Sequence, residues 1–171
     1  NNESIVMHIS NFRKVKRVED TIKVFAKISK SVNAVLLMVG DGPERQHIED
    51  LTRSMNLKNV IFLGKARSVE LLLSISDLFL LTSESESFGL SALEAMSAKT
   101  PVVSSNVGGL PEINIHNKTG FLCDVGDIEG MSHQAIKLLS DDSLLNNFKI
   151  DAFKHAQKFS IKNIYPIYEK L

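Results

Sequence analysis

Short apolar runs alternate with longer segments of helical periodicity along almost the whole chain. Continuous apolar runs are typical of strands buried on both faces of a parallel sheet. The segments between them carry apolar residues three and four positions apart, as amphipathic helices do. The predicted strands are 5–10, 34–39, 60–63, 77–81, 101–104 and 120–123. The predicted helices are 17–29, 43–55, 69–74, 88–97, a short one beginning at 108–112, and then 127–139, 142–157 and 161–170.

This alternation predicts an α/β fold, a doubly wound and Rossmann-like parallel sheet with helices on both faces. The length of 171 residues suits one domain, and no internal repeat or linker interrupts the pattern. The chain begins Asn1-Asn2-Glu3-Ser4, without an initiator methionine, and a strand follows almost at once. We therefore expect it to be a piece of a longer protein.

Composition and charge exclude several classes of protein. The formal net charge is zero, so nothing favours a general binder of nucleic acids or membrane surfaces. The apolar runs are far shorter than the roughly 20 residues that a transmembrane helix needs. The single cysteine, Cys123, cannot form a disulfide within the chain, which fits a reducing cytoplasm. Because Cys123 lies in an apolar strand, we interpret it as a core residue rather than a nucleophile.

The loops after the strands hold the candidate chemistry, because ligands of doubly wound sheets bind beyond the carboxyl ends of the strands. The loop after the first strand carries four cations within 13–17. A general basic patch is disfavoured there because Glu19 and Asp20 follow immediately. The Gly108-Gly109 pair would let the backbone approach a ligand, although a simple turn would also explain it. Such cations and glycines together suit a diphosphate.

Two glutamates, Glu86 and Glu94, flank the start of the predicted helix 88–97. The helical rise of about 1.5 Å per residue sets them roughly 9–12 Å apart. Carboxylates accept hydrogen bonds from sugar hydroxyls, and the helix N-terminus between them suits phosphate. The pattern predicts a nucleotide sugar as the ligand. The alternative is that both glutamates only favour the helix start, by roughly a few tenths of a kcal/mol.

Two further features are structural in this interpretation. The sequence Gly40-Asp41-Gly42-Pro43 is typical of a tight turn. The five histidines show no spacing of metal ligands, so we expect no metal site. His8, in the first strand, is expected in the core or in a pocket wall.

Several short motifs follow one another along the chain. They are Val39-Gly40-Asp41-Gly42-Pro43, Phe62-Leu63-Gly64, Asp77, the stretch 86–96, Pro101-Val102-Val103, Gly108-Gly109-Leu110-Pro111-Glu112 and Thr119-Gly120. Each motif alone is unspecific, but the ordered set, which spans residues 5–140, resembles the donor-sugar domain of retaining glycosyltransferases of family four, which have the GT-B architecture. Asn117 stands where the family often has glycine, and asparagine tolerates the positive φ of such a turn.

The resemblance implies roles for the residues around the predicted helix 88–97. Glu94 would accept hydrogen bonds from the ribose hydroxyls. Glu86 would hold the hexose at its 3- or 4-hydroxyl. The backbone N–H groups of Phe88, Gly89 and Leu90 would bind the diphosphate and the sugar.

The resemblance also assigns the remaining site residues. The cations Arg13 and Lys16 would stabilise UDP as it leaves, so the family needs no metal and no cofactor besides the donor. Leu63, Gly64 and Lys65 would line the uracil site.

The stretch 8–17 resembles, more particularly, the members that transfer N-acetylglucosamine (GlcNAc) from UDP-GlcNAc to L-malate. GT-B enzymes bind the acceptor on an N-terminal domain and react in the cleft between the domains. Residues 1–171 would therefore be the donor-binding half, and the helix 161–171 would cross back to the missing acceptor domain. We expect this chain alone to bind UDP weakly and to catalyse no transfer. Homo-oligomer formation stays open.

Three alternatives stay open as well. One is a relative that uses a lipid or a growing glycan as acceptor. The second is a sugar-nucleotide-binding module without catalysis, and the third is a sugar-nucleotide epimerase. A dehydrogenase is disfavoured because the loop after the first strand has no G-x-G-x-x-G motif.

Overall fold

Six parallel strands form one sheet in the computed structural model, which describes residues 3–160. The strand order is β3-β2-β1-β4-β5-β6, so the winding reverses between β1 and β4. This reversal opens the crevice in which ligands of such sheets bind. The strands are β1 (Ser4–Ser10), β2 (Ala34–Gly40), β3 (Val60–Gly64), β4 (Leu78–Leu81), β5 (Val102–Ser105) and β6 (Gly120–Cys123).

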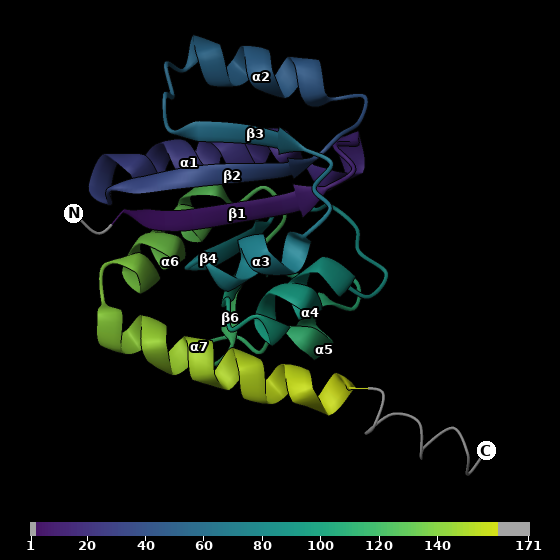
Figure 1. Ribbon diagram of the computed structural model, residues 1–171, viewed down its shortest axis with the longest axis vertical. Helices are drawn as coiled ribbons and strands as arrows, with labels where there is room; N and C mark the ends of the chain where they lie inside the picture. Colours follow the sequence, from purple (N-terminus) through teal and green to yellow (C-terminus); the bar gives the residue numbers. More distant parts are fainter. Residues whose placement is uncertain (1–2, 161–171) are drawn as a thin grey trace.

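Helices cover both faces of the sheet (Figure 1). Successive strand residues point to opposite faces, so Val6 enters one apolar core and Met7 the other. The first core is closed by α1, α2 and α6, the second by α3, α4 and α5, and α7 contributes to both. The helices are η1 (Lys14–Lys16), α1 (Val18–Ser31), α2 (Arg45–Ser54), α3 (Val69–Ser74), α4 (Leu90–Ser97), α5 (Leu110–Ile113), α6 (Ile128–Leu139), α7 (Asp142–Ala156) and η2 (Gln157–Phe159).

The predicted strands and helices within residues 3–160 are all present, with ends shifted by two residues at most. Two shifts have a clear cause, a left-handed residue that cannot be part of a right-handed helix. Arg17 has φ 47°, so α1 begins at Val18 rather than at residue 17. Gly89 has φ 85°, so α4 begins at Leu90 rather than at residue 88. The predicted helix 161–170 lies outside the described residues.

Some motif residues serve the fold itself. Asp77 accepts a hydrogen bond from the N–H of Ile5 at 3.0 Å and pairs with Lys149 of α7 at 2.7 Å. It therefore ties α7 to the start of β4 and β1. Asn117 has φ 61°, which confirms the predicted left-handed turn.

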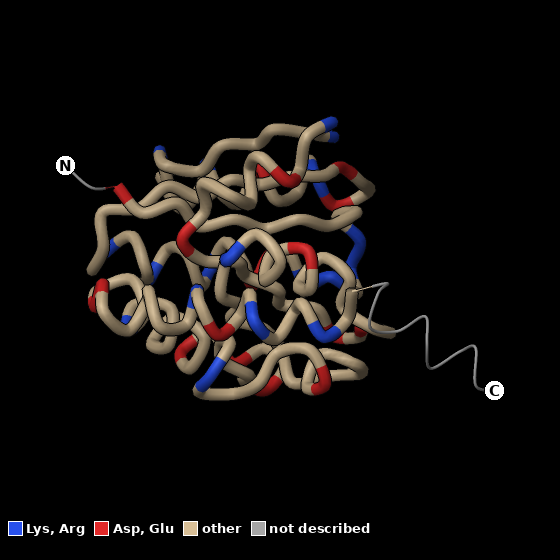
Figure 2. Tube along the Cα trace, turned by 60° about the horizontal axis from the view of Figure 1, so that its bottom comes forward, with Lys and Arg blue, Asp and Glu red and all other residues tan. Residues whose placement is uncertain are grey.

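The single cysteine lies beside a core, as expected for a residue of an apolar strand. Cys123 is half-buried beside the first core, and burial raises the pKa of its thiol to about 11. The thiol is therefore protonated at neutral pH, as a core residue rather than a nucleophile would be. Acidic and basic residues are interspersed along the trace (Figure 2). Within residues 3–160, no helix combines the length and apolarity needed to cross a bilayer.

Candidate functional site

The loop between β1 and α1 has two left-handed residues that are not glycine. Phe12 has φ 34° and Arg17 has φ 47°, and each such residue costs about 1–2 kcal/mol. The Phe12 side chain is fully buried, and its carbonyl accepts a hydrogen bond from the N–H of Glu44 at 3.0 Å. The loop is thus anchored at its beginning. Its remainder, with Arg13 and Lys16, lies at the carboxyl edge of the sheet.

Lys16 and Glu86 meet at the switch point between β1 and β4. The Lys16 ammonium lies 2.6 Å from Glu86 Oε1, and the Ser83 hydroxyl donates to the same oxygen at 2.8 Å. Only 21% of the Lys16 side chain and 11% of the Glu86 side chain are exposed, so water screens this pair less than a surface ion pair. Within residues 3–160, Glu86 Oε2 accepts no hydrogen bond, which leaves it open to a ligand hydroxyl.

The glycine pair of the β5–α5 loop supports the backbone of Glu86. A Cβ atom on Gly108, whose φ is 54°, would lie 1.7 Å from the Glu86 carbonyl oxygen. The N–H of Gly109 donates to that same oxygen at 3.2 Å. We predicted that these glycines would let the backbone approach a ligand. In the structure, the backbone that they approach is that of the Glu86 turn.

Gly40, the last residue of β2, and Gly42, just after it, have a similar role. A Cβ atom on Gly40 would lie 1.8 Å from the carbonyl oxygen of Ser10, and one on Gly42 would lie 2.1 Å from that of Asn11. The Gly40–Pro43 turn therefore packs against the loop that follows β1. The Arg45 N–H donates to the Gly42 carbonyl oxygen at 3.1 Å, so the segment ends in a turn and its contacts are structural.

The start of α4 offers backbone donors beside Glu86. Within the described residues, the N–H groups of Phe88, Gly89 and Leu90 donate to no protein acceptor. A Cβ atom on Gly89 would lie 2.5 Å from the side chain of Leu110, so α5 packs closely against this turn. Free donors at a helix N-terminus are suited to an anion such as a diphosphate.

Glu94 lines a cavity of about 600 Å³ between α3 and α4. Burial raises the pKa of the Glu94 carboxyl, and the nearby Glu70 carboxylate raises it further. Leu90 lines the same cavity, so the cavity reaches the first residue of α4. The sequence did not reveal Arg67 and Glu70, which also line it, because neither lies in a recognisable motif.

The three residues predicted at the uracil site lie at the end of β3. Leu63 is 41% exposed, and Lys65 lines a shallow hollow of about 320 Å³ with Asp41 and Gly42. None of the three lines the cavity that holds Glu94, whereas Arg67, two residues after Lys65, does line it. Their role stays a prediction.

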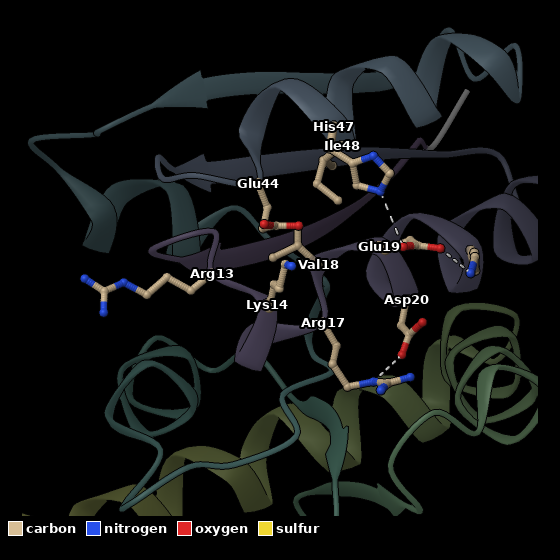
Figure 3. A pocket seen from close by; sticks show the side chains of 10 residues that line it. Arg13, Lys14, Arg17, Val18, Glu19, Asp20, Glu44, His47 and Ile48 are labelled. Atoms are coloured by element: carbon tan, nitrogen blue, oxygen red, sulfur yellow. Dashed lines mark hydrogen bonds and ion pairs between the residues drawn. The ribbon is translucent and has the colours of Figure 1, made fainter.

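A larger hollow, of about 650 Å³, lies between the starts of α1 and α2 (Figure 3). Its charges largely neutralise each other, since Arg17 pairs with Asp20 at 2.6 Å and Glu19 with Lys23 at 2.5 Å. Figure 3 shows the Arg13 side chain extending away from these acidic groups. We therefore assign no ligand to the hollow, and Arg13 remains available at its rim.

His8 is fully buried beneath the site, as a core residue. Its Nδ1 lies 2.9 Å from the Leu80 carbonyl oxygen, and its Nε2 lies 2.8 Å from the Ser10 hydroxyl. Burial lowers the pKa of His8 to about 4, so the ring is neutral at pH 7. Within residues 3–160, no group of three or more His, Cys, Asp or Glu side chains is placed to hold a metal ion.

The comparison with known families agrees with this geometry. Residues 1–155 match the model of the glycosyl transferases group 1. The chain belongs to this family. The family assignment confirms the resemblance found in the sequence, and the parallel sheet agrees with it.

Two curated relatives illustrate the similarity. The chain is 48% identical over 171 residues to N-acetyl-alpha-D-glucosaminyl L-malate synthase of Bacillus anthracis, covering 99% of this chain and 45% of that protein. It is 32% identical over 166 residues to poly(ribitol-phosphate) alpha-N-acetylglucosaminyltransferase of Staphylococcus aureus, covering 95% and 34%. The chain thus spans less than half the length of both relatives.

Solved structures of glycosyltransferases superpose closely on this fold. A TarM variant of Staphylococcus aureus, crystallised with UDP and alpha-GlcNAc-glycerol, gives a TM-score of 0.91 at 28% identity, covering 98% of this chain and 35% of that one. Anabaena HepE, crystallised with UDP and glucose, gives 0.86 at 26% identity, covering 99% and 48%.

Replacing Gly108 with alanine should move the Glu86 turn. The added Cβ would overlap the Glu86 carbonyl oxygen and would also strain the left-handed backbone. We expect Gly108→Ala to lower the free energy of unfolding by roughly 2–4 kcal/mol, measured by urea denaturation.

Gly130→Ala is the control. Its Cβ would displace the Asp127 carboxylate, which caps α6 by accepting from the Gly130 N–H, and the higher helix propensity of alanine offsets much of that loss. We expect a change within about 1 kcal/mol for this variant. A loss in Gly108→Ala no larger than that in Gly130→Ala would contradict the packing described for the Glu86 turn.

Proposed function

We propose that this chain is the donor-binding half of a retaining glycosyltransferase that transfers GlcNAc from UDP-GlcNAc to L-malate. The observation that carries the donor site is the Lys16–Glu86 pair beside the unpaired N–H groups at the start of α4. The 48% identity to the malate synthase of Bacillus anthracis supports the choice of donor sugar and acceptor.

In this proposal the diphosphate lies at the start of α4. The N–H groups of Phe88, Gly89 and Leu90 donate to its oxygens, and the helix dipole favours its charge. An ammonium group has three donors, so Lys16 can bind Glu86 and a phosphate oxygen together. Arg13, which forms no ion pair within the described residues, supplies the second cation.

The two glutamates hold the two ends of the donor. Glu86 Oε2 accepts a hydrogen bond from the hexose, while Oε1 stays with Lys16 and Ser83. Glu94 accepts hydrogen bonds from the ribose in the cavity between α3 and α4. The uracil ring extends toward Leu63, Gly64 and Lys65, at the end of β3.

Catalysis then rests on charge and position. Negative charge develops on the diphosphate as the glycosidic bond breaks, and Arg13 and Lys16 stabilise that charge in place of a metal. The malate hydroxyl attacks the anomeric carbon on the face that UDP leaves, which retains the configuration, and its proton passes to the departing diphosphate. Malate is bound by an N-terminal acceptor domain outside this chain, and no cofactor besides the nucleotide sugar takes part. The reaction takes place in the cytoplasm.

Glu94→Ala should weaken the binding of UDP to the whole protein. Hydrogen bonds to a charged acceptor contribute about 1.5–3 kcal/mol, so we expect the Kd to rise roughly 10- to 100-fold. Titration calorimetry with UDP measures the change. Glu129→Ala, at a 79% exposed carboxylate of α6, is the control. Equal affinities of Glu94→Ala and the wild type would remove Glu94 from the ribose site.

The pH dependence of UDP binding should reveal the Glu70–Glu94 interaction. The ionised Glu94 is the stronger acceptor, so UDP affinity should fall as the pH drops through the raised pKa of Glu94. Glu70→Gln removes one cause of that rise and should move the fall in affinity to lower pH. The ionisation of UDP is the same in the experiments with the wild type and with Glu70→Gln. Calorimetry at several pH values therefore isolates the change that comes from Glu94. Superimposable profiles would show that Glu70 does not act on Glu94.

The acceptor can be tested directly. Incubation of the whole protein with UDP-GlcNAc and L-malate should release UDP and form a GlcNAc–malate product, detected by mass spectrometry. Poly(ribitol phosphate) is the competing acceptor, because a relative that uses it covers 95% of this chain. If product formed with the polymer and none with malate, malate would be wrong as the acceptor, while the proposed donor site would stand.

A further inference from the structure

The segment after β4 binds the cationic loop through alternate residues. Thr82 Oγ1 lies 3.2 Å from the Lys16 carbonyl oxygen and 3.0 Å from that of Arg17. The N–H of Glu84 donates to the Val15 carbonyl oxygen at 2.8 Å. The Glu86 carboxylate binds the Lys16 ammonium at 2.6 Å. Residues 82, 84 and 86 therefore hold one short stretch, 15–17, at successive points.

Thr82 is the buried member of this series. Its side chain is fully buried, and its hydroxyl lies 2.8 Å from that of Thr21, which is also buried. Carbonyl oxygens only accept, so the Thr82 hydroxyl donates its single hydrogen to Lys16 and Arg17. The Thr21 hydroxyl must then donate to Thr82. The donor and the acceptor of each of these hydrogen bonds are therefore defined, from Thr21 to Thr82 and from Thr82 to the two carbonyls.

A second series of hydrogen bonds, which starts at the buried His8, holds the beginning of the same loop. His8 Nδ1 donates to the Leu80 carbonyl oxygen. The neutral ring has only one N–H, so Nε2 must accept a hydrogen bond from the Ser10 hydroxyl. The Ser10 oxygen accepts in turn from the N–H of Phe12 at 3.3 Å. Both left-handed residues of the loop are thus held by side chains outside it, Phe12 by Ser10 of β1 and Arg17 by Thr82, which follows β4.

We propose that Thr82 is a positioning residue for glycosyl transfer, because it fixes the backbone of Lys16 and Arg17 and so keeps the Lys16 ammonium against Glu86. The inference rests on the proposed function. Any buried hydroxyl that donates to two carbonyl oxygens can stabilise the fold. Thr82 differs because one of its two carbonyls belongs to the residue whose side chain contacts Glu86.

The chain offers a closely matched control in Thr100. Its side chain is also fully buried, and its hydroxyl lies 2.8 Å from the Leu73 carbonyl oxygen and 3.4 Å from that of Ser76. Thr100 precedes β5, at the end of the sheet opposite to Lys16. Thr82→Val and Thr100→Val therefore remove the same kind of buried donor, one beneath the site and one away from it.

The test compares these variants in the whole protein. Both valine variants should lower the melting temperature, and Thr82→Val should lower it more, because it also leaves the buried Thr21 hydroxyl without its acceptor. Thr82→Val alone should lower kcat by roughly 10- to 100-fold, since small displacements of a catalytic group have such effects. Thr82→Ser restores the hydroxyl and should recover most of the activity. UDP affinity, measured by calorimetry on the same proteins, should weaken in Thr82→Val and stay unchanged in Thr100→Val.

The outcomes separate the two claims. A wild-type protein that neither binds UDP nor transfers sugar overturns the proposed function, and the positioning role with it. An active wild type with an equally active Thr82→Val variant overturns the positioning role alone. Equal losses of kcat in Thr82→Val and Thr100→Val, or no recovery in Thr82→Ser, also overturn it.

Discussion

The contact between the loops that follow β1 and β4 is the constraint on which the site depends. Lys16 and Glu86 come from segments 70 residues apart and meet at 2.6 Å because β1 and β4 are neighbours in the sheet. Parallel strands end at the same edge, so the strand order alone brings the two loops together. The ion pair then fixes their mutual position, because a largely buried pair with a supporting hydroxyl tolerates little movement.

Close approach of backbone to backbone makes this contact possible. Gly40 and Gly42 admit the loop after β2 against the loop after β1, and Gly108 admits the loop after β5 against Glu86. Four loops consequently converge on one small region of the sheet edge. The left-handed backbone of Phe12 and Arg17 costs free energy, and the hydrogen bonds that run through His8 and Thr82 offset this cost.

Much of the fold could be predicted from the sequence, because apolar periodicity reports burial directly. The helix start at Arg17 was less accessible, since left-handed backbone at a non-glycine residue leaves no compositional signal. Gly89 does carry such a signal, because glycine favours left-handed backbone. The motifs also placed Glu86, Lys16 and Glu94 at one edge of the sheet. They could not show that Lys16 binds Glu86, or that Glu70 faces Glu94, because those contacts depend on side chains from separate strands and helices.

The contacts of the glycines bear on what the family motifs can report. Gly40, Gly42 and Gly108 are required by neighbouring carbonyl oxygens of the same chain, whatever sugar or acceptor is bound. A motif built on them identifies an architecture that can present a diphosphate site. Such a motif carries little information about substrate choice, which depends on side chains that contact the substrate. Recognising such a chain and knowing its acceptor are therefore separate problems, answered by different residues.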